Sequence, residues 1–228
     1  MNNYKDKYFS VLGDSISTFE GYSIPKNCEF YKMPKKLMAG VTKVSDTWWG
    51  GVIDSLGGKF LANNSISGST VCYSPSYTYQ SYGCSDFRTS TLHDGDVYPD
   101  VIMVYLGTND FGMGKKISSQ DKTDLTIFEN AYKLMLEKLK TNYKNAEIWC
   151  VSLCTCTVVS DPSFKFDCYW GGIHITEYNK TIKNLCNELN CKFIDIYNES
   201  TPYDTMDEVH PNYNGMQLIK NRILNKIV

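Results

Sequence analysis

The stretch "DVIMVYLGTND", residues 100–110, decides the fold class of this chain. Its apolar residues form a continuous run without polar alternation, which is typical of a strand buried on both faces of a parallel sheet. The run ends on Gly107 and Asn109, so polar residues follow the strand directly. We therefore expect a buried strand at Asp100–Leu106, with groups suited to chemistry after its carboxyl end.

Four further short runs have the same character, and longer segments with helical periodicity separate them. The expected strands are Tyr8–Leu12, Lys59–Asn63, Glu147–Leu153 and Lys192–Ile196, and the expected helices are Thr47–Leu56, 124–143, His174–Leu189 and Asn212–Ile227. Strands that alternate with helices predict right-handed crossovers and a central parallel sheet of about five strands, covered on both faces. The chain has no repeat, low-complexity tract or linker, so we expect residues 1–228 to form a single α/β domain.

The composition narrows the partners that the protein can have. The 228 residues are 42% hydrophobic and 21% charged, with a net charge of −2 and no basic block, which argues against nucleic acid or an anionic membrane as a partner. No segment approaches the ~18 apolar residues of a membrane-spanning helix. The apolar run near the N-terminus is too short for a signal peptide. We therefore expect a cytoplasmic protein without membrane insertion.

The nine cysteines form no recognisable metal or disulfide pattern. Their number is odd, no C-x-x-C pair occurs, and no histidine lies close in sequence to the cluster at Cys150, Cys154 and Cys156. We interpret them as reduced, small apolar residues, and we expect neither a metal nor a cofactor.

Polar residues follow the expected strands at the edge where chemistry collects in open α/β sheets. Each has an ordinary structural explanation when it is taken alone. Ser15 could cap a helix, Gly68 could supply a positive φ in a turn, and Asn109 could be a turn or capping residue. The sequence "DEVHPN" then places an acid and a histidine three residues apart, at Asp207 and His210.

Taken together, these residues supply the parts that acyl transfer from an ester requires. A serine hydroxyl becomes a nucleophile when a base such as His210 takes its proton, and Asp207 can hold the imidazole in the correct tautomer. The backbone N–H groups of Ser15 and Gly68 and the side-chain amide of Asn109 can stabilise an oxyanion.

Other polar residues near these motifs have supporting or competing roles. We expect Asp14 and Asp110 to order the loops around Ser15 and Asn109. His93 and His174 compete with His210 for the role of base, but His174 has no acid three residues before it. We interpret both as surface or capping residues.

The four stretches "GDS", "NNSISGST", "GTND" and "DEVH", in this order, resemble the SGNH (GDSL) hydrolase superfamily. Its namesake residues would fall on Ser15, Gly68, Asn109 and His210, and Asp207 matches the acid of the family. The motifs extend from residue 13 to residue 210. The resemblance implies a flavodoxin-like, three-layer α/β/α sandwich and metal-free ester hydrolysis through an acyl-enzyme.

Two long connections at 71–99 and 154–173 are rich in aromatic and hydroxyl side chains, which suit sugar rings. We expect substrate contacts from Trp48, Tyr77, Tyr79, Tyr169 and Trp170, although Trp48 could instead pack in the core. The preferred hypothesis is a short-chain, acetyl esterase acting on a carbohydrate or a similar small ester. Two alternatives stay open: a lysophospholipase or thioesterase with a longer acyl preference, and a non-catalytic carbohydrate-binding protein with a vestigial site. The sequence does not decide the oligomeric state, or whether the two connections form a lid.

Overall fold

The structure is organised around a central sheet of five parallel strands. The computed structural model describes residues 3–75, 81–156, 171–198 and 200–227. The strands are β1 (Tyr8–Gly13), β2 (Lys59–Ser65), β3 (Val101–Tyr105), β4 (Glu147–Val151) and β5 (Lys192–Ile194). Their order is β2-β1-β3-β4-β5, and every neighbouring pair is parallel. This is the flavodoxin-like order, and it confirms the predicted fold class.

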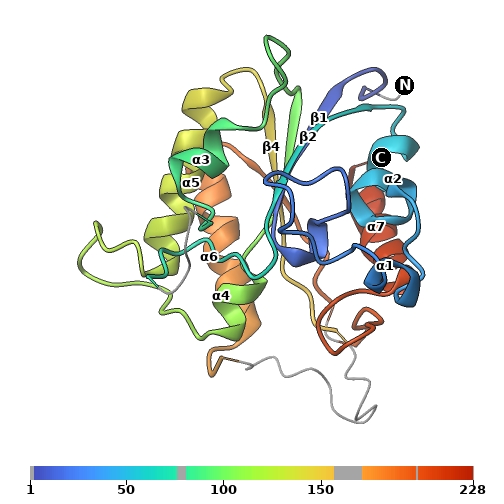
Figure 1. The fold of residues 1–228 in the computed structure, drawn as a ribbon. Coiled ribbons are helices and arrows are strands. Elements are labelled where there is room, and N and C mark those ends of the chain that lie inside the picture. Colours follow the sequence, from blue (N-terminus) through green and yellow to red (C-terminus); the bar gives the residue numbers. More distant parts are fainter. Residues whose placement is uncertain (1–2, 76–80, 157–170, 199, 228) are drawn as a thin grey trace.

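Helices cover both faces of the sheet and complete a three-layer sandwich (Figure 1). On one side lie α5 (Phe128–Asn142) and α6 (Ile175–Glu188), with the short α3 (Asp86–Ser90) packed against α5. On the other side α2 (Trp48–Ser55) packs against α7 (Tyr213–Ile227). All five predicted strands and all four predicted helices are present.

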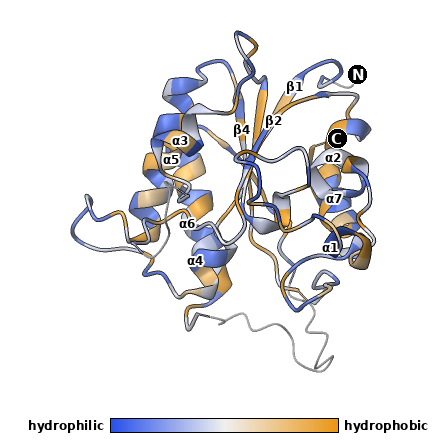
Figure 2. Cartoon of the chain, in the orientation of Figure 1, coloured by the Kyte–Doolittle hydropathy of each residue, from blue (hydrophilic) through white to orange (hydrophobic). Residues whose placement is uncertain are grey.

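The core fills the space between the sheet and these helices. Every residue of β3 is buried, and Figure 2 shows hydrophobic residues along the strands. Helix α5 buries Phe128, Tyr132, Met135 and Leu139 along one face. It begins at Phe128 rather than at residue 124, because the Asp124 carboxylate accepts hydrogen bonds from the Thr126 N–H (2.9 Å) and hydroxyl (2.7 Å), which favours a turn over a helix here.

Five short helical elements were not predicted. They are η1 (Ser15–Ser17), α1 (Lys35–Met38), η2 (Val44–Asp46), α3 and α4 (Thr108–Gly112). Elements of three to five residues are too short for a hydrophobic period to be read from the sequence.

The carboxyl ends of β1, β2 and β3 lie next to one another. Gly13, the last residue of β1, is paired in register with Ser65 of β2 and Tyr105 of β3. A Cβ atom at Gly13 would lie 2.4 Å from Ser17 Oγ, so only glycine allows the chain to turn this sharply after β1. The segments that follow these three strands therefore begin side by side.

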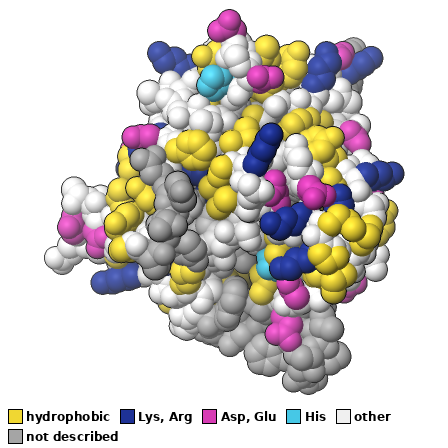
Figure 3. All heavy atoms as spheres, in the orientation of Figure 1, with side chains coloured by type: hydrophobic (Ala, Val, Ile, Leu, Met, Phe, Trp, Pro, Cys, Tyr) yellow, Lys and Arg dark blue, Asp and Glu magenta, His cyan; other side chains and the backbone are white. Residues whose placement is uncertain are grey.

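The surface carries charges of both signs. On the face drawn in Figure 3, acidic and basic side chains are interspersed among apolar ones and form no extended region of one sign. Within the ranges that the structure describes, no helix is both long and apolar enough to span a membrane.

Candidate active site

Ser15 begins the 3-10 turn η1, directly after β1. The side chain of Asp14 caps this turn by accepting a hydrogen bond from the Ile16 N–H at 3.0 Å, so Asp14, rather than Ser15, is the capping residue. The indole N–H groups of Trp48 and Trp49 donate to the Ser17 hydroxyl (3.2 Å) and carbonyl (2.9 Å). These contacts fix the backbone of the turn and leave the Ser15 hydroxyl free to face the C-terminal part of the chain.

The Ser15 hydroxyl contacts the His210 ring, and the His210 ring contacts the Asp207 carboxylate. His210 Nε2 lies 2.9 Å from Ser15 Oγ, and His210 Nδ1 lies 2.9 and 3.0 Å from the two carboxylate oxygens of Asp207. Since a carboxylate only accepts hydrogen bonds, Nδ1 must carry the proton, which leaves the lone pair of Nε2 to accept from the serine hydroxyl. The structure thus brings together the three side chains that the sequence analysis grouped as serine, histidine and acid.

The loop before α7 folds so that the Asp207 carboxylate lies next to His210. Glu208 has a left-handed backbone, with φ of 76°, and this reverses the chain between Asp207 and His210. The Asp207 carboxylate also accepts from the backbone N–H of His210 at 2.9 Å. The Met206 N–H donates to the His210 carbonyl at 2.9 Å, which closes the loop.

These contacts favour the ionised form of Asp207. Partial burial opposes ionisation, but the hydrogen bonds from the His210 ring and backbone N–H outweigh it, so the pKa of Asp207 is lowered from its ordinary value. Asp207 is therefore a carboxylate near neutral pH, as a residue that stabilises an imidazolium must be.

Phe30 supports the imidazole, and the sequence analysis missed it. Its ring is stacked on the His210 ring, with centroids 3.4 Å apart and planes 9° from parallel. Lys35 Nζ lies 4.2 Å from the Phe30 centroid, and because the imidazole occupies one face of that ring, the ammonium lies over the other. Phe30 lies in a connection without periodicity, so no sequence signal distinguished it from the other aromatics of the loops.

The structure places Gly68 and Asn109 in the segments next to Ser15. Gly68 has a φ of 78° in a turn closed by the Ser69 N–H and the Ile66 carbonyl (3.1 Å), so glycine suits this position for conformational reasons. Asn109, in the first turn of α4, donates one amide hydrogen to the Ser69 carbonyl at 2.9 Å. The amide group carries a second hydrogen that it can donate.

Asp14 and Asp110 are both fully buried, and each organises a loop. Asp110 accepts hydrogen bonds from the backbone N–H groups of Val71 (2.7 Å) and Cys72 (3.0 Å), so it orders the connection after β2. Burial raises the pKa of Asp110 to about 6, although these donors oppose the shift. Burial raises the pKa of Asp14 to about 7, against the opposing effects of the Ile16 N–H and of Arg88.

The raised pKa of Asp14 predicts a pH-dependent stability difference between the wild type and Asp14→Asn. The ordinary pKa of 3.8 applies to the unfolded chain and about 7 to the folded one, so Asp14 loses its stabilising contribution as pH rises through this window. Asp14→Asn lacks this loss, so its stability relative to the wild type should increase from pH 4 to pH 7 by at most about 1.4 kcal/mol per pH unit. Urea denaturation at several pH values measures the difference, and a difference independent of pH would contradict the assignment.

Of the five predicted substrate contacts, the structure contradicts one and does not describe the other four. Trp48 is fully buried and bonded to Ser17, so the prediction that it contacts substrate is wrong: it packs in the core beneath the turn that carries Ser15. Tyr77, Tyr79, Tyr169 and Trp170 lie outside the described residues.

The two competing histidines have local roles. His93 is paired with the Gly95 carbonyl through Nδ1 at 2.8 Å and stacks on Tyr98. His174 caps α6, where its side chain accepts from the Thr176 N–H at 3.3 Å. Of the three histidines, His210 is the one in contact with Ser15.

In the described part of the chain, no group of three or more His, Cys, Asp and Glu residues could hold a metal ion. The eight cysteines described there are free thiols. Burial raises the pKa of several of them, Cys84 to about 12 among them, so these are inert neutral groups rather than candidate nucleophiles.

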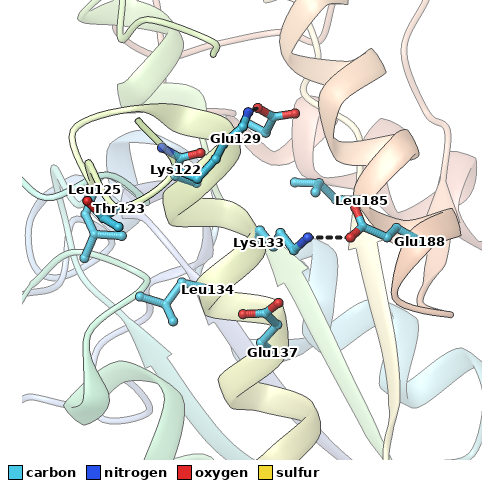
Figure 4. A pocket seen from close by; sticks show the side chains of 10 residues that line it. Lys122, Thr123, Leu125, Glu129, Lys133, Leu134, Glu137, Leu185 and Glu188 are labelled. Atoms are coloured by element: carbon cyan, nitrogen blue, oxygen red, sulfur yellow. Dashed lines mark hydrogen bonds and ion pairs between the residues drawn. The ribbon is translucent and has the colours of Figure 1, made fainter. Parts of the chain in front are cut away.

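A groove of about 490 Å³ lies away from Ser15, between α5 and α6 (Figure 4). Two of its acidic side chains are paired, Glu129 with Lys122 at 2.7 Å and Glu188 with Lys133. These charges neutralise each other, and no candidate catalytic residue lines the groove. Among the described residues, Ser15, Asp207 and His210 therefore lie at the carboxyl edge of the sheet and not in this groove.

Comparison with known proteins agrees with this geometry. The family described as GDSL-like Lipase/Acylhydrolase matches residues 7–227, nearly the whole chain. The chain belongs to this family. It is an ester hydrolase of the GDSL type, as the order of its motifs predicted.

Solved structures of GDSL-like lipases are similar along their whole length. The chain is 30% identical to one from Bacteroides uniformis, with a TM-score of 0.72 and coverage of 97% of this chain and 95% of that chain. It is 27% identical to one from Bacteroides ovatus, with the same TM-score and coverage of 97% of each chain. A family two carbohydrate esterase from Clostridium thermocellum has the same fold at 19% identity and a TM-score of 0.61, covering 99% of this chain and 64% of that chain. No curated protein matches the chain.

Proposed function

We propose that this GDSL hydrolase cleaves short-chain, chiefly acetyl, esters of carbohydrates or similar small alcohols through an acyl-enzyme on Ser15. The observation that supports the catalytic part is the continuous path from Ser15 Oγ through the His210 ring to the Asp207 carboxylate, with each step at 2.9–3.0 Å. This arrangement generates a serine nucleophile without a metal.

In the first half of the reaction, Ser15 Oγ forms a bond to the ester carbonyl carbon. His210 Nε2 takes the hydroxyl proton, and the electron pair of the carbonyl moves onto its oxygen. When the C–O bond to the alcohol breaks, His210 returns the proton to the leaving oxygen. Asp207 stabilises the imidazolium between these two transfers without taking up a proton.

Three donors converge on the developing oxyanion in this proposal. They are the backbone N–H groups of Ser15 and Gly68 and the second amide hydrogen of Asn109. Donors that are fixed before the reaction stabilise charge without reorganisation. The 3-10 turn η1, the Gly68 turn and helix α4 provide that fixed support.

In the second half, a water molecule replaces the alcohol. His210 removes a proton from this water, whose oxygen attacks the acyl carbon. Collapse of the second oxyanion breaks the bond to Ser15 Oγ, which recovers its proton from His210, and the free acid is released. The enzyme returns to its starting protonation state.

Asn109→Ala should lower kcat by about 10²–10³-fold and leave KM nearly unchanged, because an oxyanion donor acts mainly in the transition state. Initial rates on p-nitrophenyl acetate measure both constants. The matched control is Asn130→Ala, since Asn130 also donates to loop carbonyls but lies at α5. Equal kcat in Asn109→Ala and the control would remove Asn109 from the proposed oxyanion hole.

The proposed substrate class rests on the groups around Ser15. The proposed site contains Gly68, Asn109 and His210, and the sequences of the connections at 71–99 and 154–173 are rich in tyrosines and hydroxyl side chains and include one tryptophan. Aromatic faces with hydrogen-bonding groups suit a sugar ring, and a small polar site suits an acetyl group. The shared fold with a family two carbohydrate esterase is consistent with this proposal.

One observation favours a second candidate, a lysophospholipase or thioesterase. Three apolar side chains are exposed beside Phe30 and Lys35: Met33 (53%), Leu37 (53%) and Met38 (72%). Apolar side chains next to a cation would suit an amphiphilic substrate with a long acyl chain.

Chain-length preference separates the two candidates. The rates on p-nitrophenyl acetate, butyrate and octanoate would be compared, with Ser15→Ala as the blank. We expect kcat/KM to be highest for acetate and acetic acid to be released from an acetylated sugar. A preference for octanoate would replace the first candidate with the second.

A further inference from the structure

The connection between β2 and β3 contains a fully buried arginine, Arg88 of helix α3. Its Nη2 donates to the carbonyls of Gly13 (2.6 Å) and Asn64 (3.0 Å). Its Nη1 donates to Ser69 Oγ (2.5 Å) and to the Ser81 carbonyl. Within the described ranges, the partners of the guanidinium are thus one hydroxyl and three backbone carbonyls rather than a carboxylate.

These partners belong to the segments that carry the proposed oxyanion donors. Gly13 is two residues before Ser15, at the end of β1. Asn64 is at the end of β2, in the segment that leads to Gly68. Ser69 follows Gly68, and its carbonyl accepts the hydrogen bond from Asn109 Nδ2 at 2.9 Å. One planar cation therefore binds two of the donor segments directly and is linked to the third, that of Asn109, through Ser69.

Burial of the positive charge of Arg88 costs free energy, and the hydrogen bonds of the guanidinium must offset this cost. Burial lowers the pKa of Arg88 to about 9, while the nearby Asp14 opposes the shift. The group is still protonated near neutral pH. A buried cation is seldom retained for stability alone, since an apolar side chain of similar volume often serves as well or better. Its value here is geometric, because a rigid guanidinium fork sets the relative positions of the carbonyls it binds.

Helix α3 holds Arg88 firmly. Ser85 caps the helix by accepting from the Arg88 N–H at 3.3 Å. From α5, Lys138 donates to the Cys84 carbonyl and Asn142 to the Thr89 carbonyl, both at 2.9 Å. The backbone on each side of Arg88 is thus fixed to the helical layer.

We propose that Arg88 is a positioning residue that sets the distances between the three oxyanion donors on Ser15, Gly68 and Asn109. The proposal rests on the proposed acyl-transfer function. Arg88 does not touch the substrate, so its removal should weaken binding of the transition state and leave binding of the ester in its ground state nearly unchanged.

The test compares Arg88→Met with Arg222→Met on p-nitrophenyl acetate. Arg222 is the matched control because its guanidinium also binds loop carbonyls, those of Ile196 (3.3 Å) and Thr201 (2.6 Å), away from the oxyanion donors. We expect Arg88→Met to lose at least about 10²-fold in kcat, the effect of losing one oxyanion donor, with KM within about threefold. Arg88→Lys should recover part of kcat, and Arg222→Met should keep the wild-type value.

The affinity of a trifluoromethyl ketone provides a readout that a merely structural role would not change. This inhibitor forms a tetrahedral adduct with a serine and places an oxyanion in the hole, so its inhibition constant should rise in step with the loss of kcat/KM. If Arg88→Met does not fold, Ser69→Ala replaces it, with an expected loss of about tenfold in kcat from the single lost contact.

The outcomes separate this proposal from the proposed function. A wild-type kcat in folded Arg88→Met, or in Ser69→Ala when Arg88→Met does not fold, would overturn the positioning role and leave the acyl-transfer mechanism intact. An equal loss in Arg222→Met, or a loss of kcat without weaker ketone binding, would also overturn it. Absence of Ser15-dependent turnover in the wild type would overturn the proposed function itself.

Discussion

Ser15→Ala should lower kcat on p-nitrophenyl acetate on the order of 10⁶-fold, because it removes the atom that forms the acyl-enzyme. The loss should appear in kcat rather than in KM, since the hydroxyl makes its decisive bond only as the reaction proceeds. The substitution leaves the Asp14 cap and the Trp48 and Trp49 contacts in place. We therefore expect the variant to fold like the wild type, with an unchanged circular dichroism spectrum.

Ser67→Ala is the matched control for this loss, since Ser67 is an exposed serine next to Gly68 on the same edge of the sheet. We expect it to keep the wild-type rate. Residual Ser15→Ala activity within tenfold of the wild type would mean that another group attacks the ester.

His210→Asn should cause a loss of similar size, about 10⁶-fold in kcat, because members of a catalytic triad act as a unit. Asparagine cannot take up the proton that Ser15 Oγ releases. The residual kcat of the variant should not depend on pH between 6 and 9, since no other base lies in contact with Ser15 within the described residues. Rates of the wild type and the variant across this range measure both expectations.

His93→Asn and His174→Asn are the controls, because these histidines were the sequence-level competitors for the same role. Each makes its contacts locally, His93 with Gly95 and His174 with Thr176. We expect both variants to keep kcat within about threefold of the wild type, as is usual for substitutions outside a catalytic unit. A full loss in either one, with His210→Asn active, would transfer the role of base to that residue.

The sequence was sufficient for the fold because its strands are buried on both faces. A continuous apolar run such as Val101–Tyr105 has few structural alternatives to a buried strand. The alternation of such runs with segments of helical periodicity indicates the α/β fold class. The boundary at residue 124 was wrong, because a local hydrogen bond from Thr126 to Asp124 outweighs the apolar period. Short elements such as α3 and α4 carry no period at all, so sequence patterns cannot locate them.

The residues proposed to react were accessible to sequence reasoning, and the residues that contact them from other segments were not. Ser15, Asn109 and the pair Asp207 and His210 follow strand ends or precede a helix, where their type has chemical meaning. Phe30 and Arg88 act through tertiary contacts, with partners far away in sequence.

For Trp48, the sequence suggested a substrate contact where the structure has a core residue. An aromatic residue beside polar loops suggested a sugar-binding surface, but its indole is buried against Ser17. Burial depends on how α2 packs against the sheet, and a single residue type in a short helix does not reveal that.

The most direct test of the central claim is to locate the acyl group on the enzyme during turnover. The enzyme is mixed with p-nitrophenyl acetate, quenched with acid within the first turnovers, digested and analysed by mass spectrometry. The proposed mechanism predicts one acetyl group, on the peptide that contains Ser15, and none in Ser15→Ala. An acetyl group on a different residue that turns over at the catalytic rate, or rapid turnover with no acyl-enzyme at all, would contradict it.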